Sequence, residues 1–205
     1  MFGIQLPVDI TTGHIIKPNL DVYYPMVIKL LSTTVQQKIN TAILAAVNKM
    51  ISDQGYPKNP NTQISASYEV KTNERGVLSL TLINDAYSGG VHDLVVIKPL
   101  NFDVNTGNLY TLKDLFKPNS NYVKVLSHIV RKQIKDRNID KYLLGEFIGI
   151  KPNQDFYIAD KDLVIVFQLY ELTSYAFGFP HFPISVYDIK DIINEQGPLG
   201  KMLYL

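Results

Sequence analysis

Alternating hydrophobic and polar positions in the middle of the chain predict a β-meander. Residues 63–71 and 77–86 alternate, and residues 73–76 between them have the Asn and Gly content of a turn. A third extended segment, residues 91–104, follows a Gly-Gly pair. Because hairpin-connected strands pair with their neighbours, we expect an antiparallel sheet here.

Helical periodicity is found on both sides of this meander. Before it, Thr34 and Gln37 stand at capping-box spacing at the start of a helical pattern that Gly55 and Pro57 end. The apolar positions on one face of this pattern are Val35, Ile39, Ala42, Ile43, Ala46 and Met50. After the meander, residues 120–135 repeat the periodicity and predict a second long helix.

Shorter elements are predicted near the two ends of the chain. Residues 21–30 are rich in β-branched and aromatic side chains, which favour a strand. Residues 155–159 and 163–168 predict a hairpin, followed by an aromatic loop through Pro183 and a closing helix near residues 188–195. Because strands and helices are grouped rather than strictly alternating, we expect an α+β fold with an antiparallel β-sheet packed by two main helices on one side.

The length and composition of the chain fit one folded domain. Its 205 residues, 46% hydrophobic and 19% charged, are enough to bury a substantial core. We therefore expect residues 1–205 to form a single compact domain. Residues 1–62 would be its N-terminal strand-helix part, and residues 63–205 its main sheet, second helix and C-terminal hairpin.

Charge and residue usage narrow the possible partners and leave the compartment open. Twenty Lys and Arg against nineteen Asp and Glu give a net charge of +1, and the densest basic cluster, residues 131–137, ends a predicted helix. We therefore expect no nucleic-acid partner. The chain has no cysteine, no run of eighteen apolar residues and no signal-peptide pattern in residues 1–7. It is then either a cytosolic protein or a trimmed form of an exported one.

The sequence predicts neither a metal site nor a cofactor. None of the four histidines has another histidine three or four residues away; they are His14, His92, His128 and His181. The run Ser88-Gly89-Gly90 is glycine-rich, but it lies between two strand-like segments and does not lead into a helix that could bind phosphate. A hairpin corner or β-bulge explains it more simply.

His92 and Glu171 are weak catalytic candidates. His92 could act as a general base oriented by Asp85 or Asp93, because imidazole titrates near neutral pH. It could equally form a local hydrogen bond at a turn. Glu171 follows an apolar strand, and its carboxylate could instead accept hydrogen bonds from backbone amides of the next loop.

Aromatic side chains gather near the C-terminal end, between residues 167 and 182. They either fill the core or offer a stacking surface for a sugar or a protein anchor. The residues in question are Tyr170, Tyr175, Phe177, Phe179, His181 and Phe182.

Several motifs in a fixed order resemble a known family. They are Tyr87-Ser88-Gly89-Gly90-Val91-His92, Asn101-Phe102-Asp103-Val104-Asn105-Thr106-Gly107, Leu112-Lys113-Asp114-Leu115-Phe116, Phe156-Tyr157, residues 163–167 and residues 170–178. This ordered set resembles the domain of unknown function in the extracytoplasmic region of RsiV-type anti-sigma factors and in PdaC-type peptidoglycan deacetylases. Residues 24–40 are similar to the companion region that precedes that domain.

The resemblance implies a cell-envelope binding or sensing domain without an established catalytic role. The chain shows no sigma-binding, transmembrane or deacetylase segment, so only the wall-facing binding role carries over. The expected ligand is a wall glycan or a glycan-cleaving protein such as lysozyme, which RsiV-type proteins bind. The expected binding residues are Tyr87, Ser88, Gly89, Gly90, His92, Tyr170, Glu171, Tyr175, Phe177 and Phe179.

Two other functions remain open from the sequence. The first is a hydrolase acting on cell-wall material through His92 and a carboxylate, either Glu171 or Asp85. The second is a protein-interaction module that uses the aromatic segment as its contact and has no ligand of its own.

Overall fold

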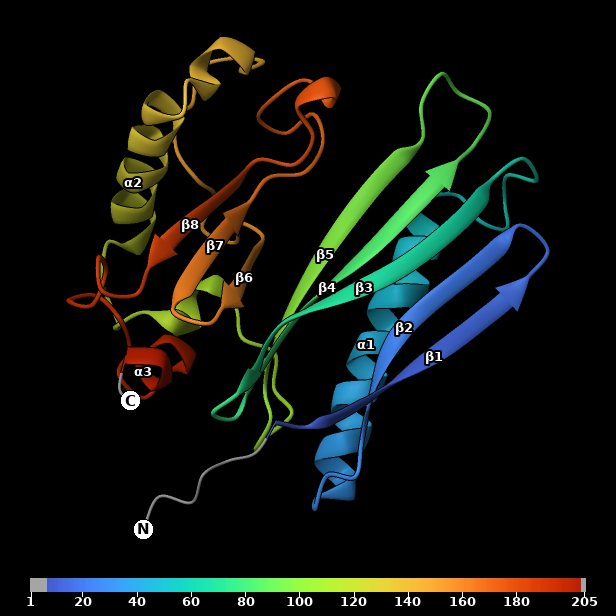
Figure 1. Ribbon diagram of the computed structural model, residues 1–205, viewed down its shortest axis with the longest axis horizontal. Coiled ribbons are helices and arrows are strands. Elements are labelled where there is room, and N and C mark those ends of the chain that lie inside the picture. The colour runs from blue at the N-terminus through green and yellow to red at the C-terminus, as the bar shows by residue number, and fades with distance from the viewer. Residues whose placement is uncertain (1–6, 204–205) are drawn as a thin grey trace. The chain divides into compact units, whose positions relative to one another are not determined.

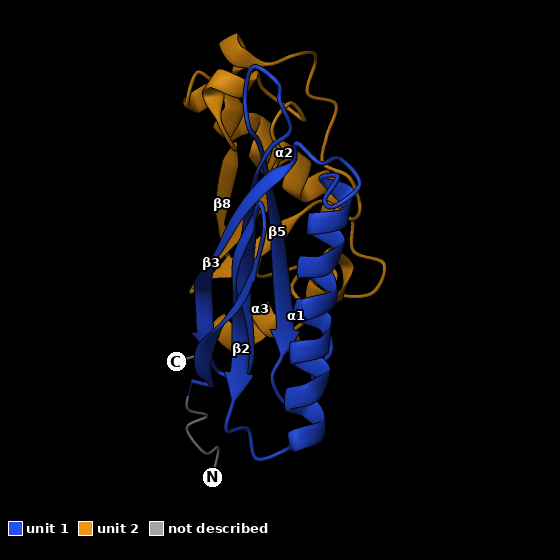
Figure 2. Ribbon diagram, turned by 90° about the vertical axis from the view of Figure 1, so that its right-hand side faces the viewer, with its two compact units in different colours: residues 1–109 blue, residues 110–205 orange. Residues whose placement is uncertain are grey.

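The computed structural model describes residues 7–203, which divide into two compact units between residues 109 and 110. Figure 2 colours these two units separately. The interpretation of residues 1–7 as lacking a signal peptide falls almost wholly outside the described part of the chain. The assignment of residues 1–205 to a single domain stays a prediction.

The first unit is a five-stranded sheet with one long helix on one of its faces (Figure 1). The strands follow one another across the sheet in chain order. They are β1 (Asp9–Lys17), β2 (Leu20–Ile28), β3 (Gln63–Glu74), β4 (Val77–Tyr87) and β5 (Leu94–Asp103), and the helix is α1 (Thr33–Asp53). The predicted meander is therefore confirmed as β3, β4 and β5, and β1 is a strand that the sequence analysis did not identify.

One strand pair departs from the antiparallel sheet that the sequence predicts. β2 and β3 run parallel and share three residue pairs, from Leu20 with Ile64 to Val22 with Ala66. α1 lies between these two strands in the sequence, and a parallel pair needs such a crossover because a tight turn can only reverse the chain. The sheet is therefore mixed, with its other three strand pairs antiparallel.

α1 is amphipathic, and its apolar face covers the sheet. Ile39, Ile43 and Val47 are buried against β-strand residues in one hydrophobic cluster. The helix begins two residues earlier than predicted, because Ser32 rather than Thr34 is the N-cap. The Ser32 hydroxyl accepts a hydrogen bond from the Val35 amide at 3.3 Å.

Two asparagine side chains satisfy backbone groups that the sheet leaves unpaired. The amide of Asn40 on α1 accepts a hydrogen bond from Val27 N and donates one to Val27 O, both at 2.8 Å. Asn73 forms the same pair of bonds with the backbone of Val8, both at 2.9 Å. Each amide therefore replaces the neighbouring strand that would otherwise pair with that residue.

The second unit contains a three-stranded antiparallel sheet in the order β6-β7-β8 (Figure 1). Its long helix, α2 (Tyr122–Asp136), buries Leu126, Val130 and Ile134 on one face. The elements are η1 (Leu112–Leu115), α2 (Tyr122–Asp136), η2 (Ile139–Tyr142), β6 (Phe156–Ala159), β7 (Asp162–Val166), η3 (Tyr175–Phe177), β8 (His181–Ser185) and α3 (Pro198–Leu203).

The predictions for the end of this unit were partly wrong. The aromatic segment that was predicted to be a loop through Pro183 ends in β8. This is an edge strand, which tolerates Pro183 because an edge needs fewer ladder hydrogen bonds. Residues 188–195 form turns instead of a helix, and the only helix after them in the described residues is α3. Backbone hydrogen bonds from Lys117 N to Ile192 O and from Asn194 N to Leu115 O, both 2.9 Å, hold the end of this segment beside the end of η1.

The α+β class and two main helices are confirmed. Each of the two helices belongs to its own unit: α1 covers the five-stranded sheet, and α2 lies beside β8, where Gln133 and Arg137 donate hydrogen bonds to the Pro183 and His181 carbonyls. The sequence predicted one sheet because nothing in the strand patterns marks a boundary between the first five strands and the last three.

Candidate functional site

A row of polar side chains crosses the sheet of the first unit on the face opposite α1. Asp21 on β2 pairs with Ser65 on β3, and Ser65 pairs with Asp85 on β4. Their neighbours in sequence, such as Leu20, Ile64 and Ala66, belong to the hydrophobic cluster under α1. Because successive side chains on a strand point to opposite faces, the row lies on the other side of the sheet.

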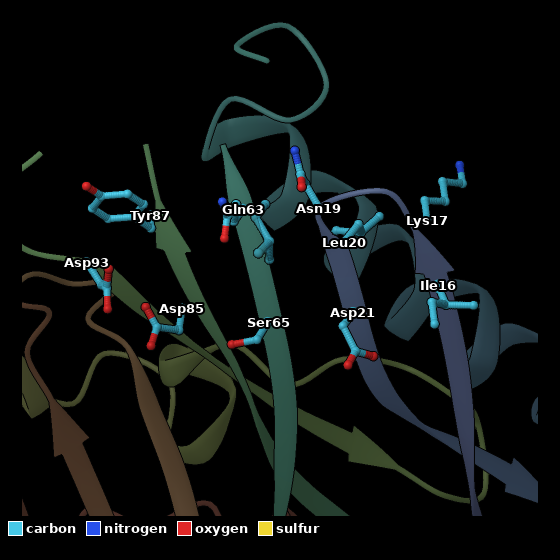
Figure 3. A pocket seen from close by; sticks show the side chains of 11 residues that line it. Ile16, Lys17, Asn19, Leu20, Asp21, Gln63, Ser65, Asp85, Tyr87 and Asp93 are labelled. Carbon is cyan, nitrogen blue, oxygen red and sulfur yellow. The ribbon is translucent and has the colours of Figure 1, made fainter. Parts of the chain in front are cut away.

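This row forms the floor of a groove of about 420 Å³, which is shown in Figure 3. Gln63 lies beside it on β3, and Tyr87 and Asp93 come from the end of β4 and from the loop that follows. The remaining lining residues are Ile16, Lys17, Asn19, Leu20 and Ile64. The volume is within the range of small-molecule sites, and the lining is rich in hydrogen-bonding groups.

Asp85 is the electrostatically unusual group of the groove. Burial, together with the negative charge of Asp93, raises the pKa of the Asp85 carboxyl above its ordinary value of 3.8. Its Oδ1 atom is shielded from solvent and has no hydrogen-bond partner among residues 7–203. Figure 3 shows Asp85 and Asp93 side by side at one end of the groove, with Asp21 on the far side of Ser65.

Asp21 has a partner within the same unit. Its Oδ1 lies 2.6 Å from Nε2 of His14 on β1, and the His14 ring stacks on Tyr23 with ring centroids 4.2 Å apart. The Tyr23 ring therefore orients the histidine, and the histidine orients Asp21. The other two carboxylates of the groove, Asp85 and Asp93, lie beside each other.

The motif at residues 87–92 forms one wall of this groove and the loop beside it. Tyr87 is 42% exposed, and the Ser88 hydroxyl lies 2.9 Å from the Thr62 hydroxyl, which fixes the start of the loop. Gly89 has a φ of 89°, a left-handed conformation that glycine adopts without strain. His92 is exposed on the same loop. The prediction of a hairpin corner between two strands is confirmed.

The predicted aromatic residues lie in the second unit, where they divide into two groups. Phe167 and Phe182 are core residues whose rings make an edge-to-face contact at 5.7 Å. Tyr170 is 55% exposed and lies 5.7 Å from the half-buried Tyr175, measured between ring centroids. The other half-buried members are Phe177, Phe179 and His181.

Glu171 fixes the turn that presents these aromatic side chains. Its carboxylate accepts hydrogen bonds from Lys151 Nζ at 2.7 Å, from Gln168 N at 2.9 Å and from Gln154 Nε2 at 3.3 Å. Burial alone would raise the pKa of Glu171, but these donors and the Lys151 charge outweigh it and hold the pKa below its ordinary value of 4.5. An ionised, fully engaged carboxylate is suited to anchoring a loop and poorly suited to donating a proton.

The Glu171 anchor should make part of the stability of the second unit dependent on pH. Because the folded-state pKa is lowered, the stabilisation is complete above pH 4.5 and is lost as the pH falls through the folded-state pKa. We expect Glu171→Gln to lower the free energy of unfolding by about 1 kcal/mol at neutral pH, with a smaller difference in acid. Urea denaturation at several pH values measures this. Glu146→Gln, at an exposed position, is the control, and equal losses at all pH values for Glu171→Gln would contradict the assignment.

The described part of the chain shows no group of three or more His, Asp or Glu side chains that could hold a metal ion. Within residues 7–203 there is also no helix long and apolar enough to cross a membrane.

The groove contains residues that the sequence analysis missed. Tyr87, Asp85 and Asp93 had been singled out, but Asp21 and Ser65 come from strands whose pairing cannot be read from a short motif. Strand alternation places each of them on the face away from the core, and this was the available signal. Aligning them with Asp85 also requires the parallel register of β2 and β3, which the sequence does not reveal.

Two family models match separate parts of the chain. Residues 16–94 match the model described as deacetylase PdaC, and residues 113–187 match the model described as a protein of unknown function, DUF3298. The resemblance drawn from the ordered motifs is thereby confirmed. The first motif, residues 87–92, falls in the PdaC match, and so does every residue that lines the groove.

A known protein is similar in sequence to much of this chain. The peptidoglycan-N-acetylmuramic acid deacetylase PdaC of Bacillus subtilis is 25% identical over 141 residues, which are 65% of this chain and 30% of that protein. The chain thus matches less than a third of that protein's length.

Two solved structures of DUF3298 family proteins share the fold. One from Bacteroides fragilis has a TM-score of 0.72 at 13% identity. The match covers 98% of this chain and 97% of the Bacteroides chain. One from Pseudomonas aeruginosa has a TM-score of 0.64 at 13% identity. The match covers 93% of this chain and 95% of the Pseudomonas chain.

Proposed function

Because this chain joins a PdaC-type region, residues 16–94, to a DUF3298 region, residues 113–187, we propose that it is a non-catalytic, extracytoplasmic module that binds peptidoglycan. The observation that carries the proposal is the groove of the first unit, since all its lining residues lie in the PdaC-type region. The related Bacillus subtilis protein is named for an activity on peptidoglycan, which supports a wall glycan as the ligand and the cell envelope as the location.

The groove has the groups that a glycan requires. Gln63 and Ser65 offer amide and hydroxyl groups for sugar hydroxyls, and the carboxylates accept hydrogen bonds from them. The exposed ring of Tyr87 provides a flat apolar surface at the edge of the groove, against which the apolar face of a sugar ring can pack. Polar floor and aromatic wall together favour a sugar over a purely apolar ligand.

Removing the Tyr87 ring should weaken binding to peptidoglycan. We expect Tyr87→Ala to raise the dissociation constant for purified, protein-free sacculi about tenfold, because an aromatic contact of this kind contributes about 1 kcal/mol or slightly more. Co-sedimentation of the full chain with sacculi measures it. Tyr187→Ala is the matched control, since Tyr187 is 51% exposed but belongs to the other unit. Absence of binding by the unsubstituted chain would refute the proposal.

The exposed aromatic side chains of the second unit favour a second ligand class, a protein. Tyr170 and Tyr175 present rings that Glu171 holds in place, as anchors at protein interfaces often do. A glycan-cleaving protein such as lysozyme is the partner to test, by capture on immobilised lysozyme. Tyr175→Ala should abolish capture and leave binding to sacculi unchanged if this surface is the contact.

The hydrolase hypothesis keeps one supporting observation, the raised pKa of Asp85 in a groove. Glu171, the other carboxylate considered, is fully engaged by Lys151, Gln168 and Gln154 within its own unit. Incubating sacculi with the full chain and measuring reducing ends and free amines tests for hydrolysis. Release that disappears in Asp85→Asn would replace the binding proposal by a catalytic one.

A further inference from the structure

The charged groups of the groove are distributed unevenly. Among the described residues, it is lined by the three carboxylates of Asp21, Asp85 and Asp93 and by one ammonium group, that of Lys17. Figure 3 shows the Lys17 side chain directed away from the three carboxylates, at the opposite edge of the groove. The interior of the groove is therefore negatively charged, and an anionic ligand would be repelled from it.

Asp85 leaves an unused hydrogen-bond acceptor at the negative end. Within the part of the chain that the structure describes, its Oδ1 is buried without a partner, and the charge of Asp93 adds a repulsion. A buried acceptor without a donor is costly, and rotation of the Asp85 carboxylate can turn this oxygen into the groove, where a ligand supplies the donor. A donor with a positive charge relieves both penalties at once.

An alkylammonium group fits this position better than an amide. It brings three donors and a positive charge, and a charge-assisted hydrogen bond to carboxylate is about twice as strong as a neutral one. An N-acetyl group has one donor and a carbonyl oxygen, which two carboxylates would disfavour. Tyr87 at the rim adds the face of an aromatic ring, which attracts cations and accommodates a sugar ring.

Resting on the peptidoglycan-binding function proposed above, we propose that this groove selects wall fragments that carry a free primary ammonium group, held by Asp85 and Asp93 with Tyr87 at the rim. Two wall components have this chemistry: an amino sugar without its acetyl group, and the side-chain amine of a stem peptide. The first is what hydrolysis of an N-acetyl group leaves behind, since breaking that amide bond with water gives the amine and acetate.

Calorimetric titration of the full chain with matched pairs of probes tests the selection. The sugar pair is the β-1,4-linked trimer of glucosamine and the corresponding trimer of N-acetylglucosamine. The peptide pair is a lysine-containing stem tetrapeptide with its side-chain amine free or acetylated. We expect the free-amine member of at least one pair to bind about fivefold more tightly, as one or two partly exposed ion pairs allow. The pair that shows the preference identifies the source of the amine.

Variants that remove one negative charge connect the preference to the groove. Asp85→Asn should reduce the preference to less than twofold, and Asp93→Asn on the exposed loop should reduce it as well. Asp53→Asn removes the same charge from the end of α1, where Asp53 pairs with Lys49 at 2.8 Å outside the groove, and should leave the preference intact. A preference that persists in both groove variants, or that Asp53→Asn also removes, would overturn the proposal.

The outcomes separate this inference from the function on which it rests. Equal affinity for acetylated and free-amine probes in both pairs, with sacculi still bound, would overturn the selection and leave peptidoglycan binding standing. Failure to bind every probe and sacculi as well would refute peptidoglycan binding itself. Circular dichroism of each variant checks that the fold is retained.

Discussion

Phe182→Ala is expected to lower the free energy of unfolding of the second unit by about 3 to 5 kcal/mol, the usual cost of removing a fully buried aromatic ring. Phe182 has no exposed surface, its ring makes an edge-to-face contact with Phe167, and the Arg137 guanidinium lies 5.3 Å from its ring centroid. The substitution therefore leaves a cavity and also removes an aromatic and a cation–π contact.

Urea denaturation followed by circular dichroism and tyrosine fluorescence measures the Phe182 effect. Tyr175→Ala, in the same aromatic segment, is the matched control and should cost less than about 1 kcal/mol, because its half-buried ring leaves no enclosed cavity. Similar losses for the two variants would show that the aromatic segment acts as one core element, and would remove it as a candidate contact surface.

Asn40→Ala is expected to cost about 2 to 3 kcal/mol in the first unit, which is large for a polar residue on a helix. The substitution leaves Val27 N and Val27 O without the partners that they have at 2.8 Å, in a partly buried position where water cannot fully replace them. Helix propensity acts in the opposite direction, since alanine is the better helix former by about half a kcal/mol.

Asn48→Ala on the same helix is the control for Asn40. Asn48 is exposed, so the gain in helix propensity should make that variant as stable as the unsubstituted protein or slightly more stable. Chemical denaturation of both variants, with hydrogen exchange at the Val27 amide, distinguishes loss of the two Asn40–Val27 hydrogen bonds from a general loss of helix stability. An Asn40→Ala protein as stable as Asn48→Ala would show that Val27 finds other partners.

Local patterns in the sequence sufficed for several elements of the fold. The meander of β3, β4 and β5, the two long helices and the β6–β7 hairpin follow from periodicity and turn residues, because each depends on contacts close in sequence. Pro183 in β8 and the turns at residues 188–195 did not follow. Their conformation is set by distant partners, such as the Leu115 carbonyl that binds Asn194 N.

The candidate site was predicted less completely than the fold. The Tyr87 motif led to the right loop, and Asp85 and Asp93 were named only as possible partners of His92. The groove itself depends on Asp21 and Ser65 lying beside Asp85, which requires the parallel register of β2 with β3. A register between strands separated by a 21-residue helix is a property of tertiary packing, so a strand pattern alone could not supply it.

The short parallel junction between β2 and β3 also has a consequence for how this sheet assembles. The β3–β5 meander is built from neighbouring hairpins and should form early, whereas the three pairs between β2 and β3 must wait until the chain has crossed over through α1. Asp21 and Asp85 lie on opposite sides of this junction. A ligand that contacts both would act as a bridge across the last-formed part of the sheet, and its binding energy would oppose detachment of the β1–β2 hairpin.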